Sequence, residues 1–135
     1  MSTFELDLRR FKKKIEGRAK LVVQKVALDI DKGVVLQTPV DTGRARGGWN
    51  VGINNVNLSD TGEDKSGAKT IAENESTITR ADHSDAIFIS NNVDYIEELE
   101  KGSSDQAPQG MVAKTLRRFP QIVRKATNEA KREQP

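Results

Sequence analysis

The sequence predicts an α+β protein with a long N-terminal helix, a small antiparallel or mixed sheet, and a C-terminal helix kinked near Pro120. Three observations predict this class. Apolar residues recur at helical spacing through the first quarter of the chain, two short segments near 49–53 and 86–90 have the pattern of strands, and helical spacing returns after residue 110. Because the chain has 135 residues and no internal repeat, we expect a single domain spanning residues 1–135.

The first element is predicted to be a helix over residues 5–37, with Thr3 placed as a cap. Its apolar stripe has steps of three or four and consists of Leu8, Phe11, Ile15, Ala19, Val22, Val26, Ile30 and Val34. Pro39 ends it, because a residue before proline disfavours the helical region. Such a helix would be roughly 50 Å long, so we expect part of its stripe to meet another chain.

A strand and loop region is predicted over residues 47–110. It is preceded by a turn at Val40–Gly43, where Gly43 can take a positive φ. The region comprises a half-buried strand at 49–53 with one apolar face, a polar loop at 54–67, a short helix near 66–80, a central strand at 86–90, and a helical turn at 95–99 closed by Gly102.

The last element is predicted to be a helix over residues 110–130. Its apolar spacing is kept by Met111, Leu116, Phe119, Ile122, Val123, Ala126 and Ala130. Pro120 interrupts this pattern, because proline lacks an N–H donor and clashes with the preceding turn. We therefore expect a kink or two short helices there.

Composition restricts the chemistry available to the chain. There is no Cys and one His, which excludes disulfides, thiol nucleophiles, thiolate zinc sites and His-rich metal sites. We expect no cofactor, no metal and no catalysis. No apolar run approaches the roughly 18–20 residues of a membrane span, and the N-terminus lacks the pattern of a signal peptide. We therefore expect no membrane partner.

Charge is unevenly distributed along the chain. Residues 1–50 carry 11 basic and 6 acidic residues, residues 51–110 carry 4 and 12, and residues 111–135 carry 7 and 2. The small overall net charge of +2 therefore hides two basic ends around an acidic middle. Such a division bears on association rather than on fold.

Two motifs suggest chemistry but have simpler interpretations. Asp41-Thr42-Gly43 matches the tripeptide of aspartic proteases, yet it follows a predicted helix instead of an apolar strand, so we interpret it as a turn. His83 lies among Asp82, Ser84 and Asp85, but the members of a catalytic triad converge from different elements, so an exposed loop histidine is favoured.

Basic residues decorate both terminal helices and suggest a second function class. They include Arg9, Arg10, Lys12, Lys13, Lys14, Arg18 and Lys20 in the first, and Arg117, Arg118, Arg124, Lys125, Lys131 and Arg132 in the last. Basic helices can bind phosphates. Stacking aromatics are scarce, however, so solvated faces or contacts to an acidic surface of another subunit are favoured over nucleic-acid binding.

Three segments in a fixed order carry a family resemblance. After the first helix comes Thr38-Pro-Val-Asp-Thr-Gly-Arg-Ala-Arg-Gly-Gly-Trp49; a strand then enters Ile89-Ser-Asn-Asn-Val-Asp-Tyr-Ile-Glu-Glu-Leu-Glu-Lys-Gly102; Gln106-Ala-Pro-Gln-Gly-Met-Val112 opens the final helix. The ordered set resembles the neck or tail-completion proteins of long-tailed double-stranded-DNA bacteriophages, the head–tail joining group similar to minor tail protein Z. The chain departs from that pattern at Asp94-Tyr95-Ile96, where such proteins often have Pro-Tyr-Ala.

The resemblance implies a structural virion protein at the head–tail junction, assembled in the host cytoplasm. Proteins of this group form rings, typically of about six subunits, which need a head-to-tail interface between unlike surfaces. The implied partners are further copies of the chain, a head-closing connector, and tail terminator or tail tube proteins. Double-stranded DNA would pass through the lumen and contact the ring only transiently.

Seven residues are candidates for the subunit interface: Arg44, Arg46, Trp49, Tyr95, Glu97, Glu98 and Glu100. We expect the two arginines to pair with the three glutamates on a neighbour. The two aromatic residues are either core residues or interface anchors, with the core favoured for Trp49. The alternatives to a neck protein are a small nucleic-acid-binding module with basic helices and a DTG-type aspartic protease.

Overall fold

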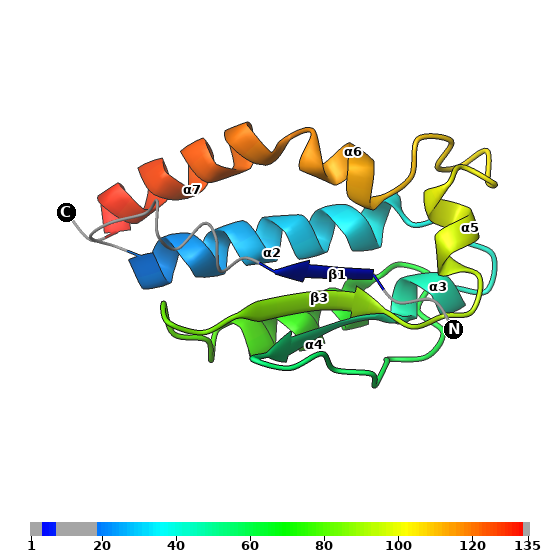
Figure 1. The fold of residues 1–135 in the computed structure, drawn as a ribbon, viewed down its shortest axis with the longest axis horizontal. Coiled ribbons are helices and arrows are strands. Elements are labelled where there is room, and N and C mark those ends of the chain that lie inside the picture. Colours follow the sequence, from blue (N-terminus) through cyan, green and yellow to red (C-terminus); the bar gives the residue numbers. More distant parts are fainter. Residues whose placement is uncertain (1–3, 8–18, 134–135) are drawn as a thin grey trace.

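A computed structural model describes residues 4–7 and 19–133 of the chain. The order of elements is that of an α+β fold, as predicted (Figure 1). The elements are β1 (Phe4–Asp7), α2 (Ala19–Gln37), α3 (Arg44–Gly47), β2 (Trp49–Ile53), α4 (Ala68–Ile78), β3 (Ile87–Asn91), α5 (Ile96–Glu100), α6 (Val112–Leu116) and α7 (Phe119–Glu133).

The strands form an antiparallel sheet in the order β1-β3-β2. β3 is the central strand, which confirms the prediction for residues 86–90. Its residue Ile89 is opposite Leu6 of β1 and Val51 of β2. The sheet therefore joins the first described residues of the chain to its middle.

One face of the sheet packs against a layer of helices. α2 has α4 on one side and α6 and α7 on the other (Figure 1). The core between helices and sheet includes Trp49, Val51, Ile87 and Ile89 from the strands together with Ile30 from α2, all at most 2% exposed. The apolar alternation of the strands thus supplies the core face, as period-two patterning requires.

The opposite face of the sheet is also covered near β2, where a half-buried strand was expected. Asn50 and Gly52 are buried, and Asn57 in the following loop donates a hydrogen bond to the carbonyl of Val51. A Cβ at Gly52 would meet the Asn55 carbonyl at 2.0 Å. A loop that folds back over the strand explains why the polar face of the strand is not solvated.

The N-terminal helix is shorter than predicted. The structure describes it from Ala19 to Gln37, whereas residues 4–7 form β1; Thr3 and residues 8–18 lie outside the described residues. The prediction of a helix from residue 5 is wrong because Phe4–Asp7 gains backbone hydrogen bonds from pairing with β3, a partner invisible to local periodicity. The described stripe is buried within the chain and comprises Val22, Val26, Ile30 and Val34, so the length of α2 gives no argument for an exposed apolar rod.

The predicted helix over residues 110–130 is two helices, α6 and α7, separated at Arg117–Arg118. Pro120 is the second residue of α7, within the first turn, where a backbone N–H has no intrahelical partner. The expected break is therefore present, with the proline starting the second helix. That helix continues to Glu133, beyond the predicted end.

The contact between α2 and α6 depends on a glycine. A Cβ at Gly33 would lie 2.8 Å from Cγ2 of Thr115, and the Thr115 hydroxyl accepts a hydrogen bond from Gln37 at 2.7 Å. Glycine costs helix stability of up to about 1 kcal/mol, but here it permits close packing of two helices. The groove described below begins at this contact.

Candidate interaction surfaces

Trp49 is a core residue, as favoured from the sequence. Its side chain is fully buried, and its Nε1 donates a hydrogen bond of 2.8 Å to the Thr38 hydroxyl, which itself donates to the Val34 carbonyl. This chain of bonds satisfies the one polar atom of the indole. Trp49 therefore fixes the end of α2 against β2 and presents no surface to another subunit.

Arg46 binds backbone carbonyls of its own chain. Its Nη2 donates to Leu36 and its Nε donates to Thr38, both at 2.9 Å, while its Nη1 donates to Lys65 at 2.9 Å. The first two carbonyls lie at the C-terminal end of α2, where a cation compensates unpaired acceptors. Arg46 thus holds the turn after α2 against the loop at Lys65, while its pairing with a neighbour's glutamates stays a prediction.

Arg44 has an acidic partner in the same chain. Its Nη2 lies 2.9 Å from Oδ2 of Asp60, and both side chains are partly exposed. The adjacent Gly43 has φ of +87°, as predicted for this turn, and its carbonyl accepts the N–H of Asp64. The pair orders the loop around the turn, while the pairing of Arg44 with a neighbour stays a prediction.

Glu100 caps a helix instead of belonging to an open acidic cluster. Its Oε1 accepts the N–H groups of Met111 and Val112, each at 2.8 Å, and its Oε2 accepts that of Ala113 at 3.0 Å. These N–H groups begin α6 and have no intrahelical acceptors. The carboxylate therefore ties α5 to α6, and its role is within the chain.

The remaining candidates lie on an exposed surface. Tyr95 is 44% exposed, and Glu97 and Glu98 are exposed on α5. We call these three residues the acidic face of α5. The structure thus divides the three candidate glutamates: Glu100 caps α6, whereas Glu97 and Glu98 form an outward-facing acidic surface beside Tyr95.

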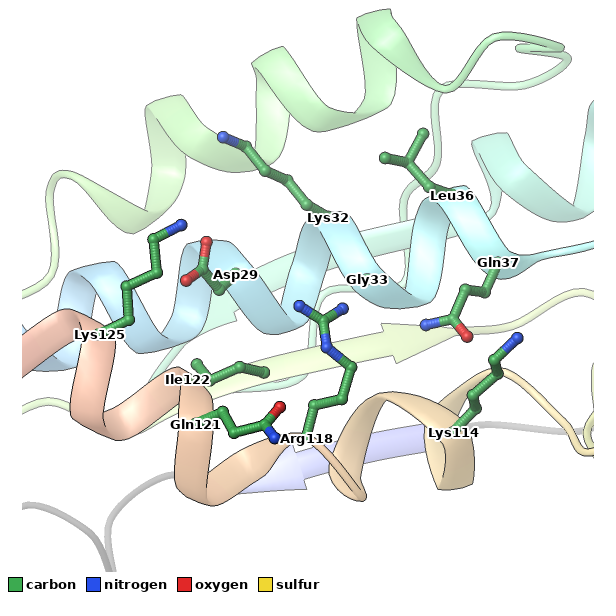
Figure 2. A pocket seen from close by; sticks show the side chains of 10 residues that line it. All are labelled: Asp29, Lys32, Gly33, Leu36, Gln37, Lys114, Arg118, Gln121, Ile122 and Lys125. Atoms are coloured by element: carbon green, nitrogen blue, oxygen red, sulfur yellow. The ribbon is translucent and has the colours of Figure 1, made fainter.

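A second surface lies between α2 and the α6–α7 pair (Figure 2). It is a groove of about 490 Å³, which we call the basic groove. Its walls carry four exposed cations, a single carboxylate and two apolar side chains: Lys32, Lys114, Arg118 and Lys125; Asp29; Leu36 and Ile122. Leu36 is 51% exposed and is the one exposed apolar side chain among these lining residues.

The cations of the basic groove are poorly neutralised. Among the described residues, Lys32, Lys114 and Arg118 have no ion pair, and Lys125 approaches Glu129 only at 4.0 Å. Another lysine of α2, Lys25, does form ion pairs outside the groove, with Glu129 and Glu133 of α7 at 3.3 and 2.8 Å. These pairs raise the pKa of Lys25, chiefly through the bond to Glu133. Positive charge therefore gathers in the groove and is cancelled beside it.

Sequence reasoning did not single out this groove. Most of its residues form two helical stripes, Asp29-Lys32-Gly33-Leu36 and Lys114-Arg118-Gln121-Ile122-Lys125. Successive residues of a stripe are three or four positions from each other, except for one pair of adjacent residues in each stripe. The sequence could have shown each stripe, but not that the two stripes face one another.

The other motifs have simple positions. Asp41 lies exposed on the turn between α2 and α3, which gives the protease alternative no geometric support. His83 is exposed, as predicted; its backbone N–H and ring bond to Asp82 and lower the pKa of that carboxyl. No group of three or more potential metal ligands occurs among residues 4–7 and 19–133, and no helix in that part of the chain is long and apolar enough to cross a membrane.

Comparison with known proteins gives no relative: no family model, no curated protein and no solved structure matches the chain. The basic groove and the acidic face of α5 are the two surfaces of the described chain that point to a partner.

Proposed function

We propose that the protein is a structural subunit of the ring at the head–tail junction of a long-tailed bacteriophage. In this role it completes or attaches the tail and leaves a lumen for the genome. The observation that carries the proposal is the presence of two unlike, oppositely charged surfaces on one small chain. A closed ring of identical subunits requires two different surfaces that meet head to tail.

The ordered motifs point the same way. The segment from Thr38 to Trp49 forms the turn that holds the end of α2, and the segment ending at Gly102 presents the acidic face of α5. The proposed partners are other copies of the chain, a head-closing connector, and tail terminator or tail tube proteins. DNA contact in the lumen would be transient and independent of sequence.

The proposal is tested by the mass and shape of the purified full chain. Native mass spectrometry and negative-stain imaging should reveal closed rings, or else a monomer that completes tail-deficient phage particles in vitro. A monomer that neither forms rings nor completes such particles would overturn the proposal.

Binding of nucleic acid is the competing function, favoured by those cations of the basic groove that form no ion pair within residues 4–7 and 19–133. It predicts a monomer whose affinity for duplex DNA falls steeply as salt rises, because bound cations release counterions from the phosphates. Salt-dependent DNA binding without assembly would therefore favour this alternative.

A further inference from the structure

We propose that the basic groove of one subunit receives the acidic face of α5 of the neighbouring subunit. The inference rests on the proposed ring and identifies the two surfaces that form its repeating junction. Its occupant is a second copy of this chain, recognised by two carboxylates and one aromatic side chain.

The groove has the chemistry to bind an acidic, partly apolar surface. Lys32 extends from α2, while Lys114 and Arg118 extend from the α6–α7 side (Figure 2). Two apolar side chains also line the groove, the exposed Leu36 on α2 and the buried Ile122 on α7 (Figure 2). An incoming carboxylate can thus pair with cations from both walls while an apolar side chain covers Leu36.

The acidic face of α5 offers the complementary groups. Glu97 and Glu98 are exposed, and Tyr95 exposes 44% of its surface directly before them. A tyrosine supplies a large contact area with a polar tip, which suits an interface. An aromatic residue followed by two carboxylates therefore complements a groove that carries cations and one exposed leucine.

Internal bonds hold α5 in place for such a contact. The Glu100 carboxylate binds three N–H groups at the start of α6, and Gly102 closes α5 with a φ of +95°. Because a preformed element loses little conformational freedom on binding, this anchoring favours association. It also keeps α5 from entering the groove of its own chain, which α5 does not line.

The two surfaces lie on different parts of the subunit. α5 is at one end of the molecule, and the groove follows α2 beside α6 and α7 (Figure 1). A contact between them is therefore heterologous and leaves one free groove and one free α5 on every dimer. Repetition of the contact closes a ring when the rotation between subunits permits it.

The composition of the groove favours this occupant over a nucleic-acid backbone. Asp29 disfavours any anionic occupant, so the discrimination comes from Leu36, which lines the groove, is 51% exposed and gains nothing from a phosphate. An acidic protein surface with an aromatic residue uses both the cations and the leucine.

Reversal of charge on each surface tests the inference. K114E/R118E in the groove and E97K/E98K on α5 should each raise the protein concentration needed for ring assembly at least about tenfold, because like charges then face each other. The four reversals combined should restore rings. K131E/R132E is the matched control, since these exposed cations lie on α7 outside the groove and should leave assembly unchanged.

Mixing the two double variants gives a sharper result. The groove variant retains a normal α5 that suits the normal groove of the α5 variant, and the reversed groove of the first suits the reversed α5 of the second. Native mass spectrometry should then detect mixed rings in which the two variants alternate, although neither variant assembles alone. Circular dichroism and urea unfolding of each variant establish that it is folded.

Failures of the two proposals are distinguishable. If the wild-type chain forms rings and both double variants form them equally well, or the four reversals fail to restore rings in folded protein, the groove does not receive α5. If the groove variant forms normal rings but loses affinity for duplex DNA, the groove is a DNA site. A wild-type chain that neither forms rings nor completes particles overturns the ring itself.

Discussion

Asp31 should make the stability of the protein fall as pH rises. The side chain is fully buried between α2 and α4, where Oδ1 accepts a hydrogen bond of 2.9 Å from Asn74 and Oδ2 has no partner in the described part of the chain. Burial raises the pKa of Asp31 to about 7, against an ordinary value of 3.8, although Asn74 and Lys32 act in the opposite direction. Between pH 3.8 and about pH 7 the folded chain holds a proton that the unfolded chain releases. The free energy of unfolding therefore falls as pH rises.

The size of this effect follows from the two pKa values. Linkage gives a loss of about 2.5 kcal/mol in the free energy of unfolding between about pH 5 and about pH 8. Asp31→Asn removes the titration and keeps an acceptor for Asn74. Its NH2 group leaves two N–H donors without a partner, which costs about 1–3 kcal/mol at every pH.

Urea unfolding at four pH values from about 5 to about 8 measures the free energy of unfolding of wild type and of Asp31→Asn. The stability of Asp31→Asn relative to wild type should rise by about 2.5 kcal/mol across this range. Asp29→Asn is the control, because Asp29 is half-exposed on the same helix and its variant should follow the wild-type profile. Parallel stability profiles for wild type and Asp31→Asn would contradict the raised pKa of Asp31 in the folded chain.

Three further substitutions test how the surfaces are held. Gly33→Ala should destabilise the fold by about 1–3 kcal/mol because its Cβ meets Thr115, and Thr115→Ser in the same chain should recover part of the loss in urea unfolding. Glu100→Gln should cost about 1–2 kcal/mol by weakening the cap of α6, with faster hydrogen exchange at Met111 and Val112; unchanged exchange would contradict this role. Arg46→Lys should lower stability by about 1–2 kcal/mol, because an ammonium cannot reproduce the planar fork over three carbonyls, and an unchanged urea midpoint would contradict it.

The sequence predicted those features that depend on nearby residues. Pro39 ends α2, Gly43 takes a positive φ, and the alternation around Trp49 forms a strand whose indole is buried. Each of these outcomes follows from backbone sterics or side-chain period within a few residues.

Features that depend on distant partners were not predictable in this way. Residues 4–7 form β1 because they pair with β3, more than eighty residues further along the chain. Glu100 belongs by sequence to an acidic run, but the start of α6 takes its carboxylate. The basic groove brings together Lys32 on α2 and Arg118 in the turn between α6 and α7. Periodicity describes one helix at a time and gives no information on which helices become neighbours.

The proposal that this protein forms a ring of identical subunits is tested most directly by the assembly state of the purified full chain. Native mass spectrometry across a range of protein and salt concentrations should detect a closed ring of about six copies, with salt weakening the junction between the basic groove and the acidic face of α5. A chain that stays monomeric at every concentration and leaves tail-deficient particles incomplete would contradict the account.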